Sequence, residues 1–258
     1  MIFPDLTHRH LPFSVILLCL LTAVLTTYYY KHSYWDETRD AGNFANSVIF
    51  DPVTGFGGDG RQGDLCVTDG PFVNLTVNIG PGFTNKPRCV NRKISDWASG
   101  QTGSKYVEDA LNHTDYAGAL DGIYMGPHLW GHIALAMMDG NSITSSGDPL
   151  FFMHHGFVDK LWADWQARDP KRLTDISGPN YQDPDVGFKE IQGDMEEEAK
   201  IWGKPSEELL AVTPDPQAGD DGPELTLNHI MSSLGIIPNA TVADIMDTKG
   251  GFLCYEYV

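Results

Sequence analysis

The stretch "DPLFFMHHGFVDKLWADWQ", Asp148–Gln166, predicts the longest helix of the chain. Aspartate followed by proline is typical of a helix start, because the carboxylate caps the first amides and proline fits the first turn. Apolar and aromatic residues then recur at helical spacing, which predicts a helix from Asp148 to about Ala167.

One face of this predicted helix carries Phe151, His155 and Asp159, each one turn from the next, whereas His154 points about 100° away. Such a stripe is compatible with a packed core, because large aromatic residues at helical spacing are usually buried. It is equally compatible with a metal ligand, because a carboxylate one turn from a histidine can orient its ring.

A second pair of histidines lies upstream in "PHLWGH", within a predicted helix Pro127–Asp139. His128 and His132 are four residues apart, so both rings project from one face. A zinc protease needs glutamate directly after the first histidine, and Leu129 excludes that class. On their own these two histidines are compatible with an ordinary packed helix. Together with His155 they form a set of three imidazoles that suits copper or zinc.

The remaining pattern predicts a mainly α protein with long irregular loops. Helices are expected at Ser104–Leu120 and, as an acidic amphipathic helix, at Gly187–Trp202, and a strand is expected in the last eight residues. The chain has 258 residues and a net charge of −18. It shows no basic stripe that could neutralise phosphates, which argues against nucleic acid as a partner.

The cysteines and sequons indicate an oxidising compartment. A disulfide between Cys66 and Cys89 would close a Gly/Pro-rich loop. Three Asn-x-Thr sequons, at Asn74, Asn112 and Asn239, predict a glycoprotein of the secretory pathway.

Residues Leu11–Tyr30 form an uncharged apolar run long enough to span a bilayer as a helix. Three interpretations stay open: an uncleaved signal-anchor that attaches the protein to a membrane, a cleaved signal peptide of a secreted protein, and a segment that replaces native sequence through truncation or a misassigned gene start. The chain is therefore divided into residues 1–30 and a domain of residues 31–258.

The histidine segments resemble a known family. Residues 148–162 resemble the second copper-binding signature of tyrosinases and catechol oxidases (polyphenol oxidases), and "GPHLWGH" resembles the His-x3-His that precedes it. The motifs "GFGGDG", "CVTDGPF", "IGPG" and "LCYEY" resemble the short fungal tyrosinase-like oxidases. The resemblance extends over roughly Tyr34 to Tyr257.

The resemblance implies a helical bundle, copper as cofactor, and oxidation of phenols, usually o-diphenols to o-quinones, with O₂. It implies His128, His132 and His155 as the ligands of the second copper and His154 as a neighbour that does not bind. It also assigns three further roles: a gate at the substrate mouth for Phe151, a supporting carboxylate for Asp159, and the closing tyrosine motif for Tyr255 and Tyr257.

Two departures from the family affect the functional expectation. The family has three more copper-binding histidines ahead of "PYWDW", where this chain has "HSYWDET" close behind the apolar run. The sequence therefore predicts only the second-copper half of the bundle, with apolar surface on its two histidine helices left uncovered. In addition, Leu129 occupies a position that is often asparagine in enzymes that hydroxylate monophenols.

Two functions follow as expectations. The first is a copper oxidoreductase resembling catechol oxidases, acting on phenolic substrates with O₂. The second is an inactive single-copper or metal-free binding protein that pairs with another chain.

Overall fold

The computed structural model describes residues 33–82, 84–141, 144–178, 200, 219–220, 222–233, 235–250 and 253–257. The predicted apolar helix of residues 11–30 lies outside these residues, as does the predicted helix Gly187–Trp202 apart from Lys200. Within the described part, no helix is both long and apolar enough to cross a membrane.

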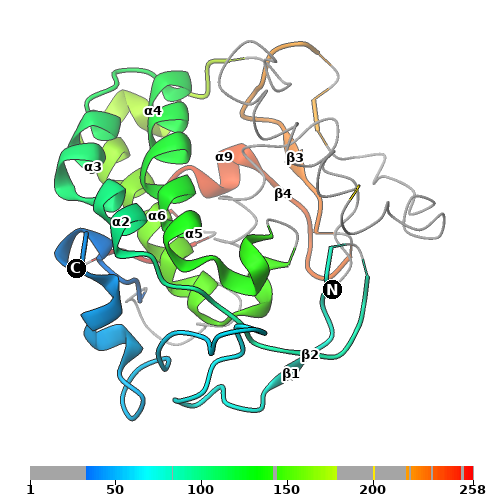
Figure 1. Cartoon of the computed structure of the whole chain (residues 1–258). Coiled ribbons are helices and arrows are strands. Elements are labelled where there is room, and N and C mark those ends of the chain that lie inside the picture. Colours follow the sequence, from blue (N-terminus) through cyan, green and yellow to red (C-terminus); the bar gives the residue numbers. More distant parts are fainter. Residues whose placement is uncertain are drawn as a thin grey trace.

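Helices dominate the described part, which confirms the mainly α prediction (Figure 1). The α-helices are α2 (Asp96–Ser99), α3 (Ser104–Leu111), α4 (Tyr116–Ile123), α5 (Leu129–Leu135), α6 (Leu150–Ala167) and α9 (Val242–Ile245). A π-helical turn, Tyr124–His128, joins α4 to α5. Short 3-10 turns lie at Glu37–Arg39, Phe44–Asn46, Val48–Phe50, Gly100–Thr102, Met137–Gly140, Ser145–Gly147 and Pro170–Leu173.

The strands are short and peripheral to the helices (Figure 1). β1 (Thr76–Val77) pairs antiparallel with β2 (Arg88–Cys89). β3 (Ile230–Met231) pairs antiparallel with β4 (Ala240–Thr241), which leads directly into α9.

Helix α6 is the central element, as its sequence predicts. The carboxylate of Asp148 accepts a hydrogen bond from the Leu150 amide at 3.0 Å and so caps the helix start. The same carboxylate forms a bidentate pair with Arg92, in which both N–O distances are 2.9 Å and both side chains are fully buried. Arg92 also donates to the carbonyl of Gly57 at 2.8 Å, so one buried cation joins a loop to the start of α6.

The predicted helix Ser104–Leu120 is broken into α3 and α4, which corrects the sequence expectation. Asp115 is the reason, because its carboxylate accepts from the Gly118 amide at 2.9 Å and starts a new helix. A short polar aspartate competes with the helix interior and favours a cap.

The predicted helix Pro127–Asp139 also has different bounds. Pro127 lies inside the π-helical turn instead of opening a helix, and α5 ends at Leu135. The next residue, Ala136, adopts the left-handed conformation, at φ 40° and ψ 42°. The helix ends here because amides of a neighbouring segment take its last carbonyls: Ser95 donates to Ala134 at 2.8 Å and Lys93 to Leu135 at 3.0 Å.

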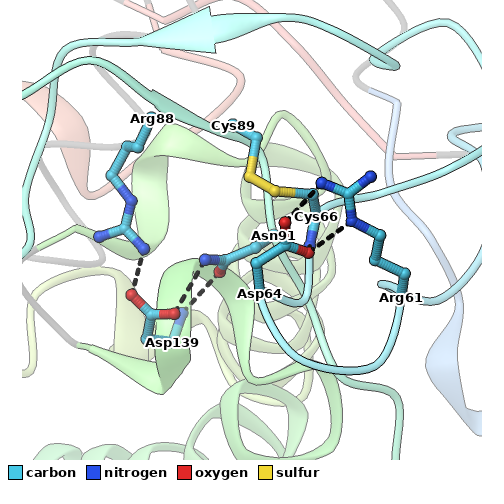
Figure 2. The surroundings of a disulfide bond; sticks show 7 residues. All are labelled: Arg61, Asp64, Cys66, Arg88, Cys89, Asn91 and Asp139. Carbon is cyan, nitrogen blue, oxygen red and sulfur yellow. Dashed lines mark hydrogen bonds and ion pairs between the residues drawn. A yellow bond between two sulfur atoms is a disulfide. The ribbon is translucent and has the colours of Figure 1, made fainter.

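The predicted disulfide between Cys66 and Cys89 is confirmed, with Cα atoms 5.6 Å apart. Figure 2 shows that it lies beside a polar cluster that holds the turn after α5. In that cluster Asn91 exchanges two hydrogen bonds of 2.8 Å with Asp139, and Arg88 forms an ion pair with the same carboxylate. The disulfide loop therefore braces the end of the helix that carries His132.

The predicted C-terminal strand is wrong within the described residues 253–257. Cys254 has φ 55°, which a strand does not allow, and no named strand is formed there. The alternating pattern instead places two tyrosines on the same side of the chain. The hydroxyls of Tyr255 and Tyr257 both donate hydrogen bonds to Asp159 on α6. The ring of Tyr257 also lies 5.5 Å from that of Tyr34, so the two ends of the described chain meet over α6.

The predicted bare apolar face on the histidine helices is not observed. Most side chains of α6 are buried, and Ile133, at 43% exposure, is the one exposed large apolar side chain of α5 and α6. One core cluster gathers residues of α3, α4, α6 and the C-terminal part, and a second packs Trp35, Phe44 and Leu135 against Leu150. The expected membrane contact and pairing of chains find no support in this surface.

Candidate metal centre

The three histidines predicted as ligands come together in the structure. His128 ends the π-helical turn, His132 lies one turn further along α5, and His155 projects from α6. Their ring centroids are 4.7–5.1 Å apart. With His154 they form a group in which each residue can offer one ligand atom within 4.8 Å of the others. Among the described residues, this is the group that could hold a metal ion.

The spacing of the nitrogen atoms fits a metal ion. The Nε2 atoms of His132 and His155 are 3.0 Å apart. Two nitrogens about 2.0–2.1 Å from one ion are roughly 2.9 Å apart at a right angle and roughly 3.3 Å apart at the tetrahedral angle. The observed separation lies between these values. Two imidazole nitrogens this close can share one proton at most, so the arrangement suits a common cation.

The electrostatics of the cluster keep the imidazoles neutral, which is the form that binds metal. Burial, followed by the electrostatic interaction with the neighbouring His154, lowers the pKa of His128 to about 3, against a smaller opposing effect of a hydrogen bond to the Tyr124 backbone. Burial also lowers the pKa of His132 and of His155 well below the usual value, and the other histidines of the cluster add to the effect. At neutral pH these three rings are therefore in the neutral form that can bind a metal ion.

The two accessory residues of the sequence prediction lie on either side of His155. The Phe151 ring packs against the His155 ring with centroids 4.0 Å apart and lies 5.7 Å from His132. Asp159 is buried and accepts from Tyr255 at 2.6 Å and from Tyr257. The Nδ1 atom of His155 is buried without a hydrogen-bond partner, so Asp159 does not hold that ring through Nδ1. Both roles, gate and supporting carboxylate, stay predictions.

Sequence reasoning missed two residues beside the cluster. Glu37 is fully buried and its Oε1 lies 2.5 Å from Nδ1 of His154. A signal for it was present, since Glu37 is the last residue of "YWDE", where the family motif has tryptophan. Tyr124, one turn before His128, places its ring 4.9 Å from the His128 ring, and burial raises its pKa to about 12.

The helical cluster with its histidines matches a known family. The model of the common central domain of tyrosinase matches residues 20–168, which is more than half of the chain. The chain belongs to the tyrosinase family. This confirms the resemblance on which copper and the ligand set were predicted. The position of the domain boundary near residue 30 stays a prediction.

Similar sequences are found among fungal tyrosinases. Tyrosinase-like protein phomQ1′ of Diaporthe leptostromiformis is 31% identical over 87% of this chain and 57% of its own length. Tyrosinase ustQ of Aspergillus flavus is 30% identical over 87% of this chain and 56% of its own length. This tyrosinase-family chain thus spans a little more than half of these relatives.

A solved structure supports the fold. A mutant of polyphenol oxidase from Thermothelomyces thermophila aligns with 87% of this chain and 65% of its own, at a TM-score of 0.63 and 24% identity. The asparagines of the three sequons are all exposed, which permits the predicted glycosylation without demonstrating it.

Proposed function

We propose that this chain takes part in copper-dependent oxidation of phenols, o-diphenols above all, to o-quinones with O₂. The observation that supports this most directly is the buried cluster in which His128, His132 and His155 approach one another as neutral imidazoles. Three neutral nitrogen donors without a thiolate suit copper. The family of the chain points to the same metal.

In this proposal the protein holds and shapes the centre and performs no acid–base step of its own. Bound copper supplies the one-electron chemistry that links the phenol to O₂. The three histidines hold the ion, and their burial keeps them unprotonated. Phe151 covers one side of His155, so it restricts water and directs the aromatic ring of a substrate toward the ligands. Overall, two o-diphenols each lose two electrons and two protons, and one O₂ becomes two waters.

A preference for diphenols over monophenols follows from Leu129. Monophenol hydroxylation requires that the phenol first lose its proton, and the asparagine often found after the first ligand helps to hold the water that accepts it. Leucine has no polar atom for such a water. We therefore assign the chain to a catechol-oxidase-like activity with weak monophenol hydroxylation.

The test combines metal analysis with oxygen uptake on the purified full chain. Copper binding together with catechol oxidation, and a catechol rate far above the tyrosine hydroxylation rate, is expected. Comparable rates on the two substrates would refute the diphenol preference. The variant Leu129→Asn should raise tyrosine hydroxylation relative to catechol oxidation, with Ile133→Asn, directly after the second ligand, as the matched control.

A second candidate function is a single-copper binding protein that pairs with another chain. It is favoured by the one histidine cluster of the described residues, because the family reaction uses two coppers. One copper per chain without catechol turnover would select this candidate, whereas two coppers per chain with turnover would exclude it.

A further inference from the structure

The buried pair Glu37–His154 lies directly beside the metal centre, although the residues are 117 positions apart in the sequence. Both side chains have no exposed surface. The His154 ring lies 4.6 Å from His132 and 5.1 Å from His155, and it stacks on His128 at 5.7 Å. His154 therefore touches all three expected ligands.

The two nitrogens of His154 have different surroundings. Nδ1 is 2.5 Å from the Glu37 carboxylate, whereas Nε2 is buried and has no hydrogen-bond partner. Buried polar atoms are rarely left without a partner, and each such case calls for an explanation such as an ion. Because the carboxylate occupies Nδ1, the nitrogen that remains for a metal is Nε2.

Helix α5 is shaped to accept this ring. A Cβ atom at Gly131 would lie 2.3 Å from Cε1 of His154 and 3.0 Å from Oε2 of Glu37. Glycine thus lets the imidazole and its carboxylate lie against the helix backbone between His128 and His132. Gly131 has no left-handed backbone angle that would itself require glycine. The reason for glycine at this position is therefore the close approach of His154 and Glu37.

We propose that His154 supplies a fourth imidazole nitrogen, through Nε2, to the ion held by His128, His132 and His155. Glu37 is the positioning residue, whose carboxylate accepts a hydrogen bond from the Nδ1–H of His154 and so fixes the tautomer with Nε2 unprotonated. Metal-binding histidines commonly donate their other N–H to a carboxylate in this way. This inference rests on the proposed copper function, and it differs from the family ligand set, in which the histidine at position 154 does not bind.

The alternative is a structural ion pair, in which His154 is protonated on both nitrogens and Nε2 cannot bind a metal. Counting the bound imidazoles separates the two. The full chain is loaded with one equivalent of Cu(II), and pulsed electron paramagnetic resonance of the bound ion counts its histidine nitrogens. Copper affinity is measured in parallel by competition with a chelator.

Four imidazoles are expected for the wild-type chain and three for His154→Gln. The variant Glu37→Gln should weaken Cu(II) binding by about 10–100-fold, the usual effect of removing such a support.

His113→Gln is the matched control, because His113 is exposed and lies outside the cluster, and it should change neither the imidazole count nor the affinity. Circular dichroism of the metal-free proteins verifies folding. The double variant Glu37→Gln/His154→Gln, which carries no buried charge at this pair, replaces any single variant that fails to fold and should also bind through three imidazoles.

Three imidazoles in the wild-type chain would overturn the proposal, as would an unchanged count and affinity in His154→Gln. If copper binds through three imidazoles and catechol is oxidised, the proposed function stands and this inference alone fails. If the wild-type chain binds no copper, both fail together.

Discussion

The substitution Gly131→Ala tests how the metal centre is packed against α5. Alanine at an interior helix position usually stabilises by about 1 kcal/mol relative to glycine. Here the new methyl group would lie 2.3 Å from Cε1 and 2.6 Å from Nδ1 of His154, distances that require atoms to move. Overpacking of this kind costs about 1–3 kcal/mol, and the buried Glu37–His154 pair leaves little room to adjust.

Subtracting the helix gain from the overpacking cost leaves a net loss of up to about 2 kcal/mol, which corresponds to a decrease in Tm of up to about 8 °C for a protein of this size. The assay is thermal unfolding of the metal-free and the Cu(II)-loaded protein. Gly100→Ala is the matched control, because Gly100 has helical angles and no atom within 4 Å of an added Cβ, so alanine should be neutral or stabilising. A Gly131→Ala protein that is about 1 kcal/mol more stable than the wild type, which is the helix gain alone, with unchanged copper binding, would refute this packing.

Three further predictions concern stability. Replacing Cys66 and Cys89 by serine should lower the free energy of unfolding by about 3 kcal/mol, because the open chain regains its loop entropy, and equal urea midpoints with and without reductant would contradict this. Asp148→Ala leaves Arg92 as an unpaired buried cation and should cost about 3–5 kcal/mol in urea unfolding, so a loss below 1 kcal/mol would argue against the buried pair. The metal-free protein should lose stability as the pH falls from about 6.5 toward 3. In this range His128 takes up a proton in the unfolded chain but not in the folded protein, where burial lowers its pKa to about 3. A Tm that stays constant between pH 7 and pH 4 would contradict this.

The parts of the fold that local sequence determines were predictable. Asp148 and Pro149 set the start of α6, and the spacing of four between His128 and His132 placed both rings on one side of the chain. The disulfide followed from two cysteines that bracket a loop. In each case the residues that decide the feature lie within 23 positions of one another in the sequence.

The parts that depend on distant contacts were not predictable. The end of α5 at Leu135 is set by amides of Lys93 and Ser95, whose approach no local pattern announces. The partner of His154 is Glu37, and the partners of Asp159 are tyrosines at the other end of the chain. Asp159 lies one turn from His155 in the sequence pattern, but the hydrogen bonds that its carboxylate accepts from Tyr255 and Tyr257 come from long-range packing that no local pattern predicts.

The separation of 117 residues between Glu37 and His154 has a consequence for the order of assembly. The four histidines lie between residues 128 and 155, so two neighbouring helices can bring them together by closing a short loop, which is fast. Glu37 joins only when the N-terminal half of the described chain has folded over α6. A nascent helix pair can therefore capture the ion first, and the arrival of the carboxylate then slows its release, so metal retention becomes a reporter of complete folding.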